Sequence, residues 1–155
     1  MNCFTGYFDL QVNGYAGVDF NSDELSDEQL VAACARLRQE GVAGILATVI
    51  SDKIDAMCGR LRRIAAICNR QLEVRQLVRG IHIEGPFLNE KPGYVGAHPP
   101  DAMRPSEPDT MERLLEAAGG LTRLGTLAPE RDPELMTTRL LADRGIVVSA
   151  GDCDA

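Results

Sequence analysis

The sequence lacks many of the residues and motifs on which enzymes build their sites. Its 155 residues include only two histidines, His82 and His98, so the chain cannot supply a histidine-rich zinc site alone. It contains neither the GxGxxG motif or P-loop of nucleotide-binding proteins nor the GxSxG motif of serine hydrolases. No Cys–His pair is suggested by position as a nucleophile and its base. These absences exclude several large enzyme classes.

Long apolar runs and an excess of positive charge are missing too. No apolar run approaches the roughly 20 residues that a membrane span needs, and the N-terminus lacks the basic segment and apolar run of a signal peptide. The formal net charge of −7 argues against a general binder of nucleic acids or membrane surfaces. The five cysteines are odd in number and form no CxxC pair, so we expect reduced thiols, used mainly as small core residues, in a cytoplasmic protein.

What is present is a regular alternation of strand and helix patterns over the whole chain. Predicted strands cover 7–12, 44–50, a run ending at Glu84, 121–127 and 146–149. Predicted helices begin at Ser26 with a capping box to Gln29, at Ser51 or Asp52, at Ser106, and at Asp132-Pro133. About five parallel strands alternating with four helices indicate an α/β fold.

Two α/β architectures fit this alternation: an open doubly wound sheet, or a partial (β/α)8 TIM-like barrel. A whole barrel typically needs about 250 residues, so the chain can supply about five of its eight units. The segment 85–105 has no periodicity and holds several prolines and glycines. A loop of this length inside a compact domain is usually functional.

Polar residues at the ends of the predicted strands are the first candidates for a site. Side chains two apart in a strand share a face, so His82 and Glu84 point the same way, and so do Asp9, Gln11 and Asn13. In a barrel, both sets face inward at the C-terminal mouth. Glu84 could ligate a metal such as Zn²⁺ there, or it could cap the following loop.

The other candidates have structural alternatives as well. His82 lies one layer deeper and is expected to support the site or the core rather than to ligate. Asn13-Gly14 favours a turn. His98, held between prolines in the long loop, could contact a substrate. Asp152 follows the last strand and could be a second oxygen ligand or a simple turn residue, and Ala128-Pro129-Glu130 is interpreted as a structural turn.

Several segments in order resemble those of one enzyme family, the N-acetylglucosamine-6-phosphate deacetylases of the amidohydrolase superfamily. They are 9–14 (DLQVNG) with 17–21 (GVDFN), 82–89 (HIEGPFLN) with 96–99 (GAHP), 126–130 (TLAPE), and 146–151 (IVVSAG). The resemblance covers nearly the whole chain. It identifies residues 1–155 as a single incomplete barrel domain, the N-terminal and middle part of the family's barrel, without the family's small β-sandwich.

The resemblance implies a hydrolase that converts N-acetylglucosamine 6-phosphate to glucosamine 6-phosphate and acetate with one divalent metal ion, Zn²⁺ in first place. Glu84 matches the family's metal-ligating Glu, and Ala97 with His98 matches a pair that contacts the substrate. Gln11 and Asn13 stand where many amidohydrolases carry a metal-binding His-x-His pair, which is similar to the subgroup that uses one ion. A homo-oligomer is implied for the full-length family member.

The chain departs from the family pattern at its end. The family's metal-binding His is replaced here by Asp152, and the family's general base, an Asp, would lie beyond residue 155. No catalytic residue is therefore expected within this chain, and we expect it to be inactive in isolation. Two other interpretations stay open: a degenerate chain that binds a sugar phosphate without cleaving it, and a different sugar-phosphate enzyme, such as an isomerase, on an open sheet.

Overall fold

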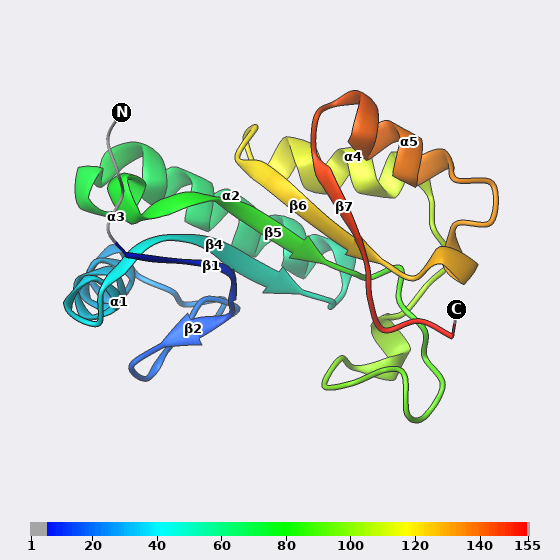
Figure 1. The fold of residues 1–155 in the computed structure, drawn as a ribbon, viewed down its shortest axis with the longest axis horizontal. Coiled ribbons are helices and arrows are strands. Elements are labelled where there is room, and N and C mark those ends of the chain that lie inside the picture. Colours follow the sequence, from blue (N-terminus) through cyan, green and yellow to red (C-terminus); the bar gives the residue numbers. More distant parts are fainter. Residues whose placement is uncertain (1–5, 155) are drawn as a thin grey trace.

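The centre of the molecule is a parallel sheet of five strands. The computed structural model describes residues 6–154, and its strands lie in the order β1-β4-β5-β6-β7 (Figure 1). They are β1 (Tyr7–Val12), β4 (Val42–Ile50), β5 (Val78–Glu84), β6 (Thr122–Leu127) and β7 (Val147–Ala150). All four neighbouring pairs are parallel, so every strand ends at the same edge of the sheet.

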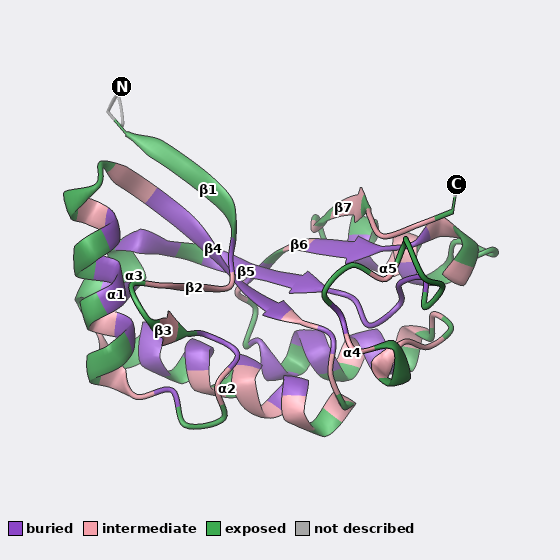
Figure 2. Cartoon of the chain, turned by 90° about the horizontal axis from the view of Figure 1, so that it is seen from below, coloured by how far each residue is buried: buried purple, intermediate pink, exposed green. Residues whose placement is uncertain are grey.

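Five α-helices follow these strands in the described part of the chain. They are α1 (Asp27–Gln39), α2 (Ile54–Arg70), α3 (Leu72–Leu77), α4 (Pro108–Ala117) and α5 (Met136–Asp143), with short 3₁₀ turns at Pro100–Ala102 and Pro129–Arg131. The long helices cover the outer face of the curled sheet (Figure 2). This half-barrel confirms the partial-barrel prediction, and an open doubly wound sheet, which carries helices on both faces, does not describe it.

The prediction of four helices was one short. It missed α3, a helix of six residues that follows α2 directly after a break at Gln71, where the backbone is extended (φ −110°, ψ 102°). Six residues complete less than two turns, so their periodicity gives a weak signal. The buried residues of this short helix are Val74 and Leu77.

Two helices, α2 and α4, begin later in the sequence than predicted. For α2, the side chains that were expected to cap the helix form hydrogen bonds elsewhere. α2 begins at Ile54, and neither Ser51 nor Asp52 caps it: the Ser51 hydroxyl donates to the carbonyl of Glu84 at 3.2 Å, and the Asp52 carboxylate accepts from the Lys53 amide at 2.7 Å. α4 begins at Pro108 rather than at Ser106. The capping box between Ser26 and Gln29 at the start of α1 is confirmed.

The last helix begins at Met136, not at Asp132-Pro133. Leu135 adopts a left-handed conformation (φ 56°) just before it, which separates the proline from the helix. The Asp132 carboxylate nevertheless accepts from the amides of Thr137 at 3.2 Å and Thr138 at 2.8 Å. It thus satisfies two amides of the first helical turn from outside the helix.

A small hairpin follows β1. It consists of β2 (Gly14–Tyr15) and β3 (Val18–Asp19), and its turn lies at Ala16 and Gly17, which both have positive φ (52° and 84°). Two such residues are typical of a type I′ hairpin turn. β1 ends before Asn13 as predicted, but the tight turn lies three residues further along than the predicted Asn13-Gly14.

The two faces of the sheet differ in chemistry. The outer face packs against the helices with apolar side chains such as Ile45, Val49, Ile81 and Ile83, all fully buried. At the N-terminal ends of the strands, the inner face is apolar and open. Its hollow of about 350 Å³ is lined by Phe8, Leu10, Leu46, Arg79, Arg123, Leu124 and Val147. We call this set the concave apolar face.

The concave apolar face is expected to make the 155-residue chain self-associate. Leu10 is 58% and Val147 is 64% exposed, and β1 and β7 each pair with one neighbour in the described sheet. Exposed apolar patches beside open strand edges promote association. We expect Leu10→Lys to shift the chain toward monomer in a concentration series by light scattering. Leu72→Lys is the matched control, since Leu72 is 68% exposed on α3; an equal effect of both variants would contradict this assignment.

The described cysteines are unpaired, and most of them are buried. Cys34, Cys58 and Cys68 are free and buried, and Cys153 is free and half-buried; Cys3 lies outside the described residues. Burial raises the pKa of Cys34 and of Cys68 to about 11, so these thiols stay protonated. Within residues 6–154, no helix has both the length and the apolar character needed to span a bilayer.

Candidate metal-binding site

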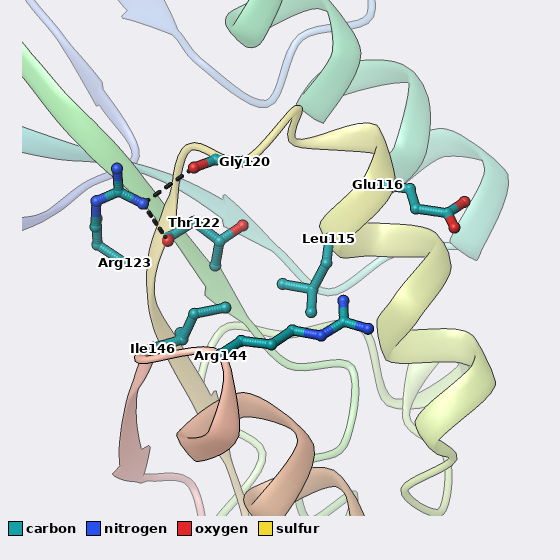
Figure 3. Close-up of a pocket in the computed structure, with 7 residues that line it drawn as sticks. All are labelled: Leu115, Glu116, Gly120, Thr122, Arg123, Arg144 and Ile146. Atoms are coloured by element: carbon teal, nitrogen blue, oxygen red, sulfur yellow. Dashed lines mark hydrogen bonds between the residues drawn. The ribbon is translucent and has the colours of Figure 1, made fainter.

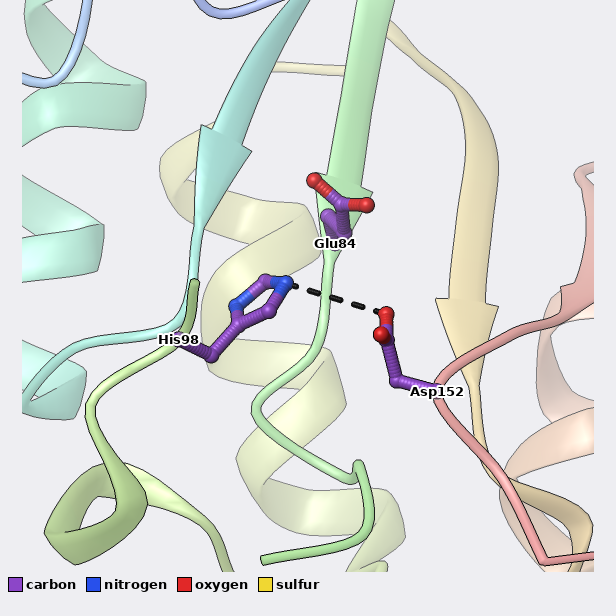
Figure 4. Close-up of side chains that lie close together, drawn as sticks. All are labelled: Glu84, His98 and Asp152. Atoms are coloured by element: carbon purple, nitrogen blue, oxygen red, sulfur yellow. Dashed lines mark ion pairs between the residues drawn. The ribbon is translucent and has the colours of Figure 1, made fainter. Parts of the chain in front are cut away.

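Three side chains from distant parts of the sequence meet at the C-terminal edge of the sheet. Glu84 ends β5, His98 lies in the long loop that follows, and Asp152 lies in the loop after β7 (Figure 4). One ligand atom from each falls within 4.8 Å of the others, and His98 Nε2 lies 3.8 Å from Asp152 Oδ2. Small side-chain rotations would bring all three into contact with one ion. The structure thus brings together three of the predicted site residues.

Glu84 is held on the inner face by the first strand. It is 7% exposed, and Gln11 Nε2 donates to its Oε1 at 2.9 Å across the intervening β4. Burial raises the pKa of the Glu84 carboxyl; His98 and the Gln11 hydrogen bond oppose this rise, and Asp152 adds to it. Among residues 6–154 no loop amide donates to this carboxylate, so the alternative role as a loop cap lacks support.

The backbone around Glu84 is tightly packed. Gly85 has φ 80° and donates its amide to the carbonyl of Thr126 at 3.0 Å. A Cβ at this position would lie 2.0 Å from Ser51 Oγ, the atom that donates to the Glu84 carbonyl. Both the conformation and the space require glycine here, and the close packing fixes the end of β5.

His82 lies one layer below Glu84 and uses both ring nitrogens inside the protein. It is 2% exposed, with Nδ1 3.3 Å from Thr48 Oγ1 and Nε2 2.7 Å from Thr126 Oγ1. Burial lowers the pKa of His82 to about 4, so the ring is neutral at pH 7. This geometry suits a supporting residue and leaves no ring nitrogen for a ligand. The two threonines were missed, although Thr48 interrupts an otherwise apolar strand.

We expect His82→Ala to lower the free energy of unfolding by about 2–4 kcal/mol, because it removes two buried hydrogen bonds and leaves a cavity. Urea unfolding at pH 7.5 measures this loss. His82→Gln, whose amide can bond to Thr48 and Thr126, is expected to lose less. Equal stability of His82→Ala and the unchanged chain would contradict the role of the ring.

The contribution of His82 to the free energy of unfolding is expected to decrease as the pH falls. Its folded pKa of about 4 lies below the ordinary 6.5, so the unfolded chain takes up a proton first as the pH falls. The stabilisation is therefore complete above pH 6.5 and is lost as the pH falls to about 4. The stability difference between the unchanged chain and His82→Gln should narrow between pH 7.5 and 4.5; a constant difference would refute this.

For the remaining predicted residues, the structure gives little evidence of a role in the candidate site. Ala97 is exposed beside His98, and its role stays a prediction. The backbone carbonyl of Asn13 accepts from the Phe20 amide at 2.9 Å, which ties the hairpin to β1. A shift in register between Asp9 and Val12 interrupts the alternation from which Asp9, Gln11 and Asn13 were expected to share one face. Of these three residues, the described structure shows a side-chain hydrogen bond to the candidate site for Gln11 alone.

A second hollow lies at the opposite edge of the sheet, where β6 and β7 begin (Figure 3). Its two arginines are already engaged. Arg123 Nη1 donates to the carbonyls of Gly120 at 3.0 Å and Thr122 at 2.9 Å, and Arg144 pairs with Glu112 at 2.6 Å. Nothing among the residues that line this hollow repeats the Glu84–His98–Asp152 cluster.

The chain is similar in sequence to several named enzymes. No protein-family model matches the chain. It is 33% identical over 153 residues to the N-acetylglucosamine-6-phosphate deacetylase of Bacillus subtilis (strain 168), covering 97% of the chain and 37% of that protein. It is 34% identical to the human enzyme of the same name, covering 94% and 36%. It is 31% identical to the N-acetylgalactosamine-6-phosphate deacetylase of Escherichia coli O157:H7, covering 94% and 37%.

The chain is also similar in fold to solved structures. The crystal structure of N-acetyl-D-glucosamine-6-phosphate deacetylase from Mycobacterium smegmatis matches with a TM-score of 0.85 at 29% identity, covering 97% of this chain and 38% of that one. A mutant of that protein in complex with N-acetyl-D-glucosamine-6-phosphate also gives a TM-score of 0.85. The chain spans a little over a third of the length of these relatives. In sequence and in fold, it is a homologue of the N-acetylglucosamine-6-phosphate deacetylases over that segment of their length.

Proposed function

We propose that Glu84 and Asp152 hold one divalent metal ion, with Zn²⁺ as the first candidate, in a site for amide hydrolysis on an N-acetylated amino sugar phosphate. The observation that carries this proposal is the cluster of Glu84, His98 and Asp152 at the edge of the sheet where parallel strands end. His98 is close enough to act as a third ligand, while the family resemblance assigns it, with Ala97, to the substrate.

The residues present fit a divalent cation. Carboxylate oxygens and an imidazole nitrogen are ordinary Zn²⁺ ligands, and three protein ligands with an open position are typical of catalytic sites. Among residues 6–154, neither Glu84 nor Asp152 pairs with a lysine or arginine, so a cation would offset two carboxylates that face each other. Asp152 stands where the family has His, and a carboxylate is harder and more negative than an imidazole.

The roles of the chain's own residues follow from this geometry. Glu84 and Asp152 would bind the ion, and Gln11 would keep the Glu84 carboxylate turned toward it. A bound ion of this kind polarises an amide carbonyl and activates water. His98 and Ala97 would border the sugar. The resemblance assigns no general base to residues 1–155, so the 155-residue chain alone is proposed to be inactive.

The substrate class is proposed from the relatives, which are named for N-acetylglucosamine 6-phosphate and for N-acetylgalactosamine 6-phosphate. Both are amino sugar phosphates that differ at one hydroxyl group. We propose the first as the substrate for which the site is built, and a small molecule as the partner rather than nucleic acid or membrane. We also propose a cytoplasmic location and one incomplete barrel domain over residues 1–155. A homo-oligomer is proposed for the full-length family member.

Calorimetric titration of the purified chain with Zn²⁺ tests the site, and a deacetylation assay tests the activity. We expect one ion per chain and no release of acetate from N-acetylglucosamine 6-phosphate. The absence of Zn²⁺ binding would refute the metal site. Robust turnover that Glu84→Gln abolishes would refute the inactivity of the chain.

A second candidate is a chain that binds a sugar phosphate without cleaving it. The observation that favours it is Asp152 in place of the family's His. Titration with glucosamine 6-phosphate distinguishes the two. Binding of equal strength with and without Zn²⁺ favours the non-catalytic chain, whereas binding that requires Zn²⁺ favours the hydrolase site.

A further inference from the structure

The loop that carries Asp152 is held by two other loops. The Asn89 amide donates to the carbonyl of Asp152 at 3.0 Å, and the Asp154 amide donates to Glu130 Oε1 at 2.8 Å. A third hydrogen bond joins these two contacts, since Asn89 Nδ2 donates to the same Glu130 oxygen at 2.7 Å. The loops after β5, β6 and β7 therefore meet in one set of hydrogen bonds.

The conformation of Asp152 makes such support necessary. Asp152 is left-handed, with φ 47°. A side chain other than glycine pays a conformational cost there and keeps that geometry only where its surroundings fix it. The two backbone contacts lie at the carbonyl of Asp152 and, two residues further along the chain, at the amide of Asp154. They restrain the backbone from which the Asp152 carboxylate reaches toward Glu84 and His98.

Burial strengthens the contacts of Asn89, which is 3% exposed, because hydrogen bonds shielded from water are stronger than exposed ones. The bond from the Asp154 amide to Glu130 lies at the exposed surface. Burial alone would raise the pKa of Glu130, but the bonds from Asp154 and Asn89 lower it overall, so the acceptor stays ionised. The ion pair between Lys91 and Asp154, at 3.3 Å, joins two largely exposed side chains and contributes little.

We propose that Asn89 and Glu130 form a clasp that positions Asp152 against Glu84 and His98. They are positioning residues, since neither belongs to the Glu84–His98–Asp152 cluster. The consequence for metal affinity rests on the proposed function, whereas the consequence for the loop does not. Glu130, interpreted from the sequence as part of a structural turn, thus acts on the candidate site from a different loop.

Substitutions at Glu130 separate hydrogen bonding from charge. Glu130→Gln keeps the Oε1 acceptor that receives both hydrogen bonds, whereas Glu130→Ala removes it. Glu134→Ala is the matched control, since Glu134 is exposed and lies four residues further along the chain. In the chain without metal, Glu130→Ala should speed amide exchange at Asp154 and Asn89 at least about tenfold and leave the Ile83 amide of the core unchanged.

In a Zn²⁺ titration, Glu130→Ala should weaken binding about 10- to 100-fold, as expected for a group that orients a ligand. Glu130→Gln and Glu134→Ala should stay near the unchanged chain in both measurements. Unchanged exchange at Asp154 in Glu130→Ala, or an equal loss in Glu130→Gln, would overturn the clasp.

The two proposals fail in different ways. If the unchanged chain binds no Zn²⁺, the metal site is refuted, and the exchange experiment alone decides the clasp. If Glu130→Ala does not fold, Asn89→Asp replaces it, because this change substitutes an oxygen for the Nδ2 donor at nearly constant shape. It should then speed exchange at Asp154, and an unchanged rate would overturn the clasp.

Discussion

Glu84→Gln is expected to weaken binding of Zn²⁺ by the chain at least about 100-fold, more than the loss of a group that merely orients a ligand. The substitution keeps the size of the side chain and its position at the end of β5. It replaces an anionic ligand by a neutral amide, which is a poor ligand for Zn²⁺. Because burial raises the pKa of Glu84, the neutral side chain is not expected to destabilise the fold.

Isothermal titration with Zn²⁺ at pH 7.5 measures this change. Glu24→Gln is the control, since Glu24 is exposed and distant from the cluster in the sequence. The thermal midpoint without metal should be the same or higher for Glu84→Gln. Retention of full Zn²⁺ affinity would remove Glu84 from the site and, with it, the observation on which the hydrolase proposal rests.

Asp152→His should increase the preference of the site for Zn²⁺ over Mn²⁺ about tenfold or more, because an imidazole suits Zn²⁺ better than it suits harder cations. The backbone allows the exchange: at φ 47°, histidine is among the residues enriched in the left-handed region, together with asparagine and aspartate. The change also introduces the residue type that the family resemblance implies for this position.

Competition between Zn²⁺ and Mn²⁺ for the unchanged chain and for Asp152→His gives the ratio of the two affinities directly. Asp154→His is the matched control, because Asp154 lies two residues away and its side chain pairs with Lys91 rather than with the cluster. An increase in Asp154→His equal to that in Asp152→His would indicate a nonspecific surface site. A ratio that Asp152→His leaves unchanged would show that residue 152 does not ligate the ion.

The sequence predicted the strands because their signals are local, whereas the half-barrel followed from the family resemblance, since the strand and helix patterns also fit an open sheet. The run 44–50 is apolar and continuous, as in a strand buried on both faces, and the strand ending at Glu84 stops at a Gly-Pro break. Gly41 and Gly145, which both have positive φ, follow the ends of α1 and α5, a placement typical of glycine. The short helix α3 and the late start of α5 were missed, because the first has too few residues for a period and the second depends on Leu135.

The candidate site was only partly predictable. The positions of Glu84 and Asp152 followed from strand ends, because parallel strands end at one edge. The contact of Gln11 with Glu84 could not be derived, since it depends on how far the sheet curls over β4. The joint role of Asn89 and Glu130 also depends on loop geometry, for which the sequence has no period.

The close packing at the end of β5 couples two positions that lie far apart in the sequence. With Ser51 Oγ occupying the space where a side chain of residue 85 would begin, a homologous chain that gains a side chain at 85 is expected to have lost the hydroxyl at 51. Substitutions at these two positions should therefore covary among relatives, and an engineered Gly85→Ala should be better tolerated together with Ser51→Gly than alone.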